Sequence, residues 1–141
     1  MLWEAAYSEK IRTADDALRF VESRMRVYIQ PGCAEPETLV EALMRRGPAV
    51  RDVEIVHMMT MGVAPYVAPE MAGHFRHNAV FIGPNVREAV NDGRADYTPI
   101  YLSEIEELFE SGAMPIDVAL VEVSPRILTV FAVSALAWTP R

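Results

Sequence analysis

The chain has 141 residues, and its 20 Asp and Glu side chains outnumber 13 Lys and Arg, for a formal net charge of -7. This length fits one domain, and a hydrophobic fraction of 51% is ordinary for a globular protein. The acidic balance argues against non-specific binding to nucleic acid or to anionic membranes, which requires basic surfaces. The single cysteine, Cys33, excludes an internal disulfide and fits a reducing compartment.

Targeting and membrane segments are absent from the sequence pattern. The N-terminal residues contain no apolar run followed by a small-residue cleavage site. The most apolar stretch, residues 127–138, is shorter than the ~20 residues that a membrane-spanning helix needs. We therefore expect a cytoplasmic protein that does not enter the membrane.

The first part of the chain predicts a helix, a strand and a second helix. Thr13 has the position and chemistry of an N-cap, and an apolar stripe at helical spacing follows it as far as Met25. The β-branched and aromatic run at residues 26–30 predicts a buried strand. The second helix is expected to start at Pro36 and to end at Gly47.

The rest of the chain continues this alternation. Short apolar runs predict further buried strands at residues 53–58, 79–82 and 117–123. Helices are predicted from Gly83 to about Asn91, and from a capping box that begins at Ser103. Because short strands alternate with helices of about ten residues, we expect an α/β domain built from parallel βαβ units.

Three segments carry a resemblance to a known family. They are GCAEPETLVEAL (32–43), FIGPNVREAVNDGRADYTPIYLSEI (81–105) and MPIDVALVEVSP (114–125). In this order and spacing the chain resembles the N-terminal domain of the acetyl-CoA hydrolase/CoA-transferase family, which includes acetate and 4-hydroxybutyrate CoA-transferases. The resemblance covers nearly the whole chain from about Thr13 to Pro125. It implies a parallel-sheet domain of the CoA-transferase type, incomplete at its C-terminus.

The resemblance also implies a function for the complete protein. Family members have two α/β domains with the active site between them, and the nucleophile is a glutamate of the second domain that forms a glutamyl-CoA thioester. The substrates would be an acyl-CoA and a small carboxylate. Coenzyme A would be a substrate, and no further cofactor is expected. A homo-oligomer is compatible with this assignment.

The sequence departs from the family pattern after Ser124-Pro125. Similar proteins continue with Asp-x-His-Gly-Phe-Cys-Ser-Leu-Gly, whereas this chain continues with ILTVFAVSALAWTPR, which contains no acid and no turn signal. With suitably chosen synonymous codons, one base added before the Ile127 codon makes this stretch read as the family continuation. We therefore expect the family domain at residues 1–126, truncated or frameshifted after Arg126, and an out-of-frame apolar tail at residues 127–141.

The turn at Pro31–Pro36 lies between a strand end and a helix start, where backbone amides and the helix dipole favour anions. By itself this pattern favours a turn that only positions the helix, whereas the family resemblance favours a loop that lines the substrate. Cys33 has no activating histidine arrangement, so we expect a small buried turn residue. Glu35 is interpreted as a helix-start acid, because the resemblance places the nucleophile beyond this chain. The candidate substrate-binding residues of this turn are Gly32, Cys33, Ala34, Glu35 and Pro36.

A second candidate turn repeats the strand, glycine and helix arrangement at Gly83. Asn85 could donate to an acyl or carboxylate oxygen and Arg87 could reach an anion. An N-cap and a surface arginine are equally compatible with the sequence. We expect Arg94 to pair with Asp96 in the following turn, or with an acid of the second domain.

The three histidines and the neighbouring methionines predict no catalytic or metal centre. His74 and His77 share a spacing of three, but no third or fourth ligand follows at a recognisable distance, so no metal is expected. We interpret these two and His57 as ordinary surface or helix-end histidines. The methionines at 58–61 predict core or loop packing.

The sequence thus predicts the N-terminal half of an acyl-CoA:carboxylate CoA-transferase or of an acetyl-CoA hydrolase, without a catalytic residue of its own. We expect this chain to be inactive alone. Two alternatives remain: a non-catalytic fragment or a stand-alone ligand-binding domain. A sugar-phosphate isomerase of the same broad fold would need an acid/base pair within this domain, and none is located.

Overall fold

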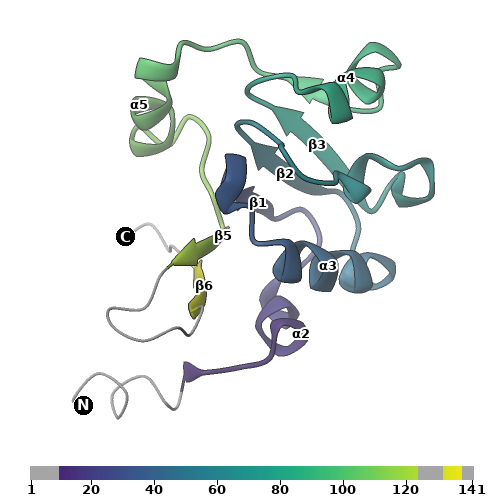
Figure 1. Cartoon of the computed structure of the whole chain (residues 1–141), viewed down its shortest axis with the longest axis vertical. Coiled ribbons are helices and arrows are strands. Elements are labelled where there is room, and N and C mark those ends of the chain that lie inside the picture. Colours follow the sequence, from purple (N-terminus) through teal and green to yellow (C-terminus); the bar gives the residue numbers. More distant parts are fainter. Residues whose placement is uncertain (1–9, 124–131, 138–141) are drawn as a thin grey trace.

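The computed structural model describes residues 10–123 and 132–137, and these form an α/β fold around a six-stranded sheet (Figure 1). The strands lie in the order β4-β3-β2-β1-β5-β6. They are β1 (Arg26–Ile29), β2 (Val53–His57), β3 (Phe75–Ala79), β4 (Asp96–Tyr97), β5 (Val118–Val123) and β6 (Ala132–Ala137). Strands β1 to β5 are parallel, and β6 pairs with β5 in the antiparallel direction. The parallel α/β sheet predicted from the sequence is therefore confirmed.

Helices cover both faces of the sheet, joined by several 3₁₀ turns. The helices are α2 (Ala14–Ala17), α3 (Glu37–Arg46), α4 (Pro84–Asn91) and α5 (Ile105–Glu110). The 3₁₀ turns are Leu18–Phe20, Gly32–Ala34, Gly47–Ala49, Pro65–Val67, Pro69–Met71 and Leu102–Glu104. Helices α2 and α3 pack on one face, whereas α5 packs on the other (Figure 1). None of the helices in the described part of the chain is long and apolar enough to cross a membrane.

Alternation along the strands separates two hydrophobic clusters. Val27 and Ile29 of β1 and Ile55 of β2 point toward α3, and all three are fully buried. Tyr28 and Val56 point the opposite way and join the cluster beneath α5. This division follows from the two-residue period of a strand, and burial on both faces explains the nearly continuous apolar runs in the sequence.

The first helix is shorter than its apolar stripe. Thr13 is the N-cap as predicted, since its Oγ1 accepts a hydrogen bond from the Asp16 N–H at 3.1 Å. However, α2 ends at Ala17, and the chain reaches β1 through a turn in which Arg24 has a φ of 68°. The Arg24 N–H donates to the Arg51 carbonyl, so tertiary contact with the start of β2 sets the path of this segment.

The third strand lies earlier than the apolar run at residues 79–82 suggests. It spans Phe75–Ala79, which includes an arginine, a histidine and an asparagine. These polar side chains are tolerated because they have partners: exposed Arg76 pairs with Asp96, and buried Asn78 donates to Glu54 Oε1 at 2.9 Å. Residues 79–82 instead end the strand and lead toward α4.

The remaining predicted elements agree with the structure except at the start of α5. The strands at 26–30, 53–58 and 117–123 and the helices from Pro36 and Gly83 are confirmed within two residues. The capping box does not begin at Ser103. A 3₁₀ turn starts the segment, and the Tyr101 N–H donates to Glu104 Oε2 at 3.3 Å.

The described part of the predicted out-of-frame tail is β6. Its backbone pairs with all of β5, from Val118 opposite Ala137 to Val123 opposite Ala132. Residues 127–131 and 138–141 of the tail lie outside the described part of the structure. The out-of-frame origin of this tail stays a prediction.

Candidate functional site

Three loops meet beyond the carboxyl ends of the central parallel strands. They follow β1, β2 and β3, and they contain Gly32, Gly62 and Gly83 respectively. Because parallel strands all end at the same edge, these loops approach one another although they are far apart in sequence. The Gly32 N–H donates to the Met59 carbonyl at 2.9 Å, which joins the first loop to the second.

Gly62 joins all three loops. Its N–H donates to Glu35 Oε2 at 3.1 Å, and its carbonyl accepts from Asn85 Nδ2 at 2.6 Å. Glu35 follows β1 and Asn85 lies in the first turn of α4. The structure therefore brings together two residues that the sequence placed in separate candidate turns.

The glycines of the loops allow this close approach. A Cβ on Gly83 would lie 2.8 Å from Asn85 Oδ1 and 3.0 Å from the Thr60 carbonyl oxygen, so a side chain there would be crowded. Gly32 has a φ of 70°, a left-handed conformation that favours glycine. Glycine is therefore favoured at Gly83 by its close neighbours and at Gly32 by its backbone conformation.

The predicted residues of the first turn differ in their exposure. Cys33 is exposed, so its interpretation as a buried turn residue was wrong. Ala34 is half-buried and Pro36 is buried. Glu35 is only 6% exposed and its carboxylate contacts Gly62 across the site, so its interpretation as a helix-start acid was also wrong. The first-turn acid of α3 is Glu37.

The second turn gives a mixed result. Asn85 is not the N-cap of α4, because Gly83 occupies that position and no side chain caps it. Arg87 is exposed on α4 and makes no ion pair with another described residue. Arg94 pairs with Asp92 at 3.1 Å, not with Asp96, because Asp96 is held by Arg76 on the neighbouring strand. The binding of substrate by Asn85 and Arg87 stays a prediction.

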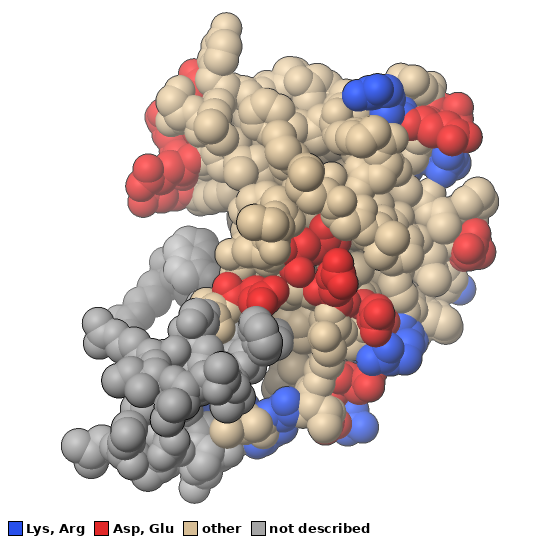
Figure 2. Space-filling view, in the orientation of Figure 1, with Lys and Arg blue, Asp and Glu red and all other residues tan. Residues whose placement is uncertain are grey.

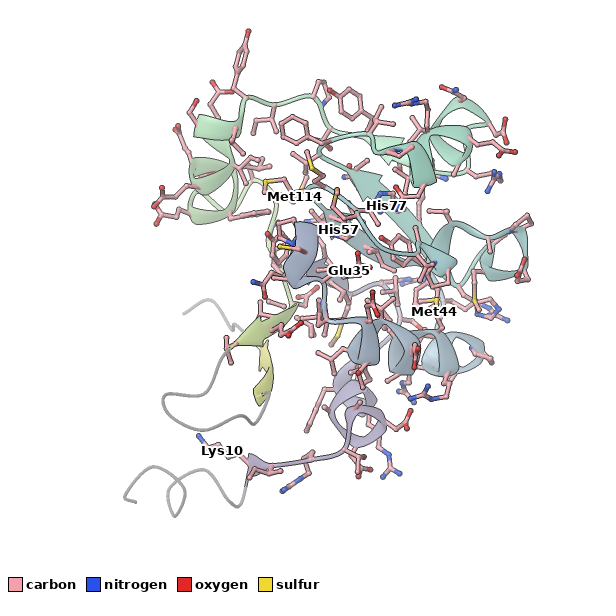
Figure 3. The ribbon with its side chains drawn as sticks, in the orientation of Figure 1. Lys10, Glu35, Met44, His57, His77 and Met114 are labelled. Carbon is pink, nitrogen blue, oxygen red and sulfur yellow. The ribbon has the colours of Figure 1, made fainter. Side chains whose placement is uncertain are left out.

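A buried polar cluster lies beneath the second loop. His57 Nδ1 is 2.9 Å from both the Thr60 Oγ1 and the Tyr66 hydroxyl. The Tyr66 ring stacks at a tilt on His77, with ring centroids 5.2 Å apart. Figure 3 shows His57, His77 and Glu35 close together in the centre of the molecule. His57 and His77 are 0% and 1% exposed, so their interpretation as surface histidines was wrong.

Burial sets the protonation states of this cluster. Desolvation lowers the pKa of His57 to about 4, assisted by the nearby His77, and desolvation also lowers the pKa of His77 to about 4. Burial raises the pKa of the Tyr66 hydroxyl. Burial also raises the pKa of Glu35, although the Gly62 N–H opposes this shift. The two histidines are therefore neutral at pH 7 and serve as buried hydrogen-bonding groups.

The sequence contained a weak signal for this cluster. His57 ends an apolar strand, and His77 alternates with Phe75 and Ala79, a spacing that places all three on one face. Because the sequence predicts the third strand at residues 79–82, the alternation of Phe75, His77 and Ala79 lies outside the predicted strand. Among the methionines, Met58 packs in the cluster beneath α5, whereas Met59 and Met61 are exposed.

Metal ligands and bases are scarce at this edge. The described residues contain no group of three or more His, Cys, Asp or Glu side chains that could hold a metal ion. Figure 2 shows acidic side chains at the centre of the face in view, with Lys and Arg toward its margins. An anionic ligand at the three loops would therefore depend on backbone amides more than on a basic patch.

A pocket of about 350 Å³ lies at the other edge of the sheet. It is lined by residues before β2 and β3 and by Tyr66, Val67 and Arg94. The Arg94 guanidinium is already engaged, since it donates to the Val67 carbonyl and to Asp92. This pocket is therefore a weaker candidate than the edge where the three loops meet.

The chemistry available at the three loops is that of binding. The exposed large apolar side chains here are Met59, Met61, Val63 and Phe81, and they lie beside the exposed polar side chains of Cys33, Asn85 and Arg87. The titratable groups nearby, Glu35 and His57, are buried. Within the described residues, no exposed acid/base pair or activated nucleophile is present at this edge.

Comparison with known proteins identifies the family. The sequence pattern of the acetyl-CoA hydrolase/transferase N-terminal domain matches residues 1–127, nearly the whole chain. The chain belongs to this family. The resemblance found in the sequence is thereby confirmed, and the match ends two residues after Pro125.

Related proteins of this family are longer. The chain is 45% identical over 124 residues to a 4-hydroxybutyrate coenzyme A transferase of Clostridium kluyveri, which covers 88% of this chain and 29% of that protein. It is 38% identical over 113 residues to a succinyl-CoA:acetate/propanoyl-CoA:succinate CoA transferase of Fasciola hepatica, covering 79% of this chain and 23% of the relative. The chain thus spans less than a third of the length of these relatives.

Solved structures confirm the fold. A 4-hydroxybutyrate CoA-transferase from Porphyromonas gingivalis superposes with a TM-score of 0.67 at 25% identity, covering 88% of this chain and 27% of that one. RipA from Yersinia pestis superposes with a TM-score of 0.71 at 21% identity, covering 84% of this chain and 30% of that one. The described sheet therefore has the fold of a part of each of these larger proteins.

Proposed function

We propose that this chain forms one wall of the substrate site of an acyl-CoA:carboxylate CoA-transferase or acetyl-CoA hydrolase. The observation that carries the proposal is the junction of three loops at Gly62, beside exposed apolar side chains such as Met61 and, among the residues that the structure describes, without an exposed acid/base pair. Membership of the family and the CoA-transferase activities of two relatives support the substrate class.

In this proposal the covalent chemistry requires a glutamate outside this chain. Its carboxylate attacks the thioester carbonyl, which releases CoA thiolate and forms an acyl–glutamyl anhydride. The thiolate then attacks the glutamyl carbonyl of the anhydride, which releases the first carboxylate and forms the glutamyl-CoA thioester. In a transferase a second carboxylate attacks this thioester and the two steps run in reverse to give the new acyl-CoA, whereas in a hydrolase water attacks it and releases CoA and the free glutamate. Coenzyme A is a substrate, and no other cofactor takes part. The residues proposed to line the cleft are Gly32, Cys33, Ala34, Glu35, Pro36, Gly83, Asn85 and Arg87. The single cysteine, which has no disulfide partner in this chain, fits the proposed cytoplasmic location.

The first test is turnover by the purified 141-residue chain with acetyl-CoA and 4-hydroxybutyrate, measured as free CoA or as exchanged thioester. We expect no activity from the chain alone. We expect activity when it is mixed with the part of the Clostridium kluyveri relative that lies beyond the aligned region. Turnover by the isolated chain would contradict the absence of a catalytic residue.

Matched variants locate the substrate. Met61→Asp places a charge at the binding edge, whereas Phe20→Asp places one at a similarly exposed position after α2. In the mixture we expect Met61→Asp to raise the KM for acyl-CoA by about tenfold, because an apolar contact is lost, and Phe20→Asp to leave it unchanged. Equal effects of both variants would argue against the proposed site.

The alternative of a stand-alone ligand-binding domain gives a different result. It predicts measurable binding of an acyl-CoA by the isolated chain and no gain of activity in the mixture. DNA sequencing downstream of the Arg126 codon also distinguishes a part of a transferase from a stand-alone domain. A displaced reading frame that encodes the family continuation would support the transferase.

A further inference from the structure

In the loop that follows β2, every second residue is held by hydrogen bonds to other parts of the chain. Thr60 is 2% exposed and its hydroxyl contacts His57, and Gly62 is bonded through both its N–H and its carbonyl. The intervening residues Met59, Met61 and Val63 are exposed. The hydrogen bonds of Thr60 and Gly62 therefore fix the loop while the apolar side chains of its other residues stay exposed.

We propose that Glu35 and Asn85 form a two-sided clamp on Gly62, and that Glu35 is a positioning residue that fixes the Met59–Val63 loop at the binding edge. The clamp itself follows from the contacts in this chain. Its consequence for substrate binding rests on the proposed function. Neither residue needs to touch the reacting atoms for this role.

Glu35 is a costly residue in its position. Burial of a carboxyl group destabilises the folded state unless hydrogen bonds compensate. The Glu35 carboxylate accepts one hydrogen bond, from Gly62, and its buried Oε1 has no hydrogen-bonding partner among the described residues. An apolar side chain at this position would pack without this loss of folding free energy. A destabilising residue that holds one particular loop in place is the pattern expected of a functional position.

Gly62 is suited to receive the clamp. A Cβ at this position would lie 2.9 Å from Glu35 Oε2 and 3.2 Å from its Cδ, so the Glu35 carboxylate would have to shift to admit a side chain. The absence of a side chain therefore lets the carboxylate reach the main-chain N–H. The contact spans 27 residues of sequence, and the pairing of β1 with β2 brings its two partners together.

Asn85 completes the clamp from the opposite side. It lies in the first turn of α4, which begins at Gly83, and its side-chain amide donates to the Gly62 carbonyl across 23 residues of sequence. The start of α4 also lies against the Thr60 carbonyl, where Gly83 leaves no room for a side chain. The loops after β1 and β3 thus hold the loop after β2 between them.

The test is residue-resolved amide hydrogen exchange on the purified 141-residue chain. Loss of one hydrogen bond with local opening corresponds to roughly a tenfold faster exchange, so we expect this increase for the Gly62 amide in Glu35→Ala. Strands β1 to β3 should keep their wild-type protection. Glu35→Gln retains an acceptor oxygen and should restore most of the protection. Glu37→Ala removes an exposed glutamate two residues away and should change nothing.

Asn85→Ala provides an independent variant, because Asn85 is exposed and its loss leaves the core intact. We expect faster exchange of the Gly62 amide here too, and less than the product of the two single effects in Glu35→Ala/Asn85→Ala, because both act on one residue. Unchanged Gly62 exchange in both single variants would overturn the proposal. A uniform rise over the whole sheet in Glu35→Ala would also overturn it, because that result marks a purely structural residue.

The experiments test the clamp and the proposed substrate site separately. If exchange responds as expected but Glu35→Ala leaves the KM for acyl-CoA in the complemented mixture unchanged, the clamp stands and the assignment of this loop to the substrate site fails. If acyl-CoA binding is lost without any change of Gly62 exchange, the site stands and the clamp fails.

Discussion

The two buried histidines predict that mild acid destabilises the domain. His57 and His77 have pKa values of about 4 in the folded chain, against an ordinary value of 6.5, because burial disfavours the charged imidazolium. The unfolded chain therefore binds protons at a higher pH than the folded chain does. Stability is fully present above pH 6.5 and falls as the pH decreases toward 4.

The size of this loss follows from the two pKa values. At pH 5 each histidine costs about 2 kcal/mol of unfolding free energy, and the loss approaches roughly 3 kcal/mol per histidine below pH 4. The two together remove about 4 kcal/mol at pH 5 if they act independently, a large part of the ~5–15 kcal/mol that stabilises a typical domain. Glu35 opposes this trend, because its raised pKa favours the folded state as the pH falls.

Urea unfolding followed by far-ultraviolet circular dichroism at pH 7 and pH 5 measures the effect. We expect His77→Gln to reduce the loss between these pH values by about 2 kcal/mol, because the variant lacks one titrating group. The matched control is His74→Gln, which changes the histidine that contacts Arg51 near the surface. An unfolding free energy that is equal at both pH values, or a loss that His77→Gln leaves unaltered, would refute the reasoning.

Three further predictions concern single residues. Gly62→Ala should cost about 1–3 kcal/mol by overpacking against Glu35, and Glu35→Ala should suppress much of this cost in a double-mutant cycle monitored by urea unfolding. Arg26→Ala should cost about 1–3 kcal/mol in the same assay, because Glu54 loses its 2.7 Å ion pair in a partly buried position. Exposed Cys33 should react fully with a thiol reagent in the native chain without a change in circular dichroism, and protection would contradict its exposure.

Most of the fold could be predicted because its signals are local. The apolar strands, the proline and glycine boundaries of α3 and α4, and the N-cap at Thr13 are readable from neighbouring residues. Errors arose where tertiary contacts overrode the local pattern. The polar strand β3 is stable because Asn78 and Arg76 find partners on adjacent strands, and no window of sequence contains those partners.

The candidate site was only partly predictable. Glycines after strand ends indicated two of its three loops, and those loops are at the predicted edge. No pattern in the sequence singles out the loop containing Gly62, which joins the other two loops. Glu35, His57 and His77 were assigned to surface or helix-end positions, because a sequence shows residue type but not the depth at which the fold places it.

The sequence by itself determined the alternation of strands and helices and the family, because the first depends on short-range periodicity and the second on a series of recognisable segments. Only the tertiary structure decided that Glu35 and Asn85 meet at Gly62 and that the two histidines are buried beneath that loop. The physical reason is the strand order β3-β2-β1, which places three distant loops at one edge of the sheet.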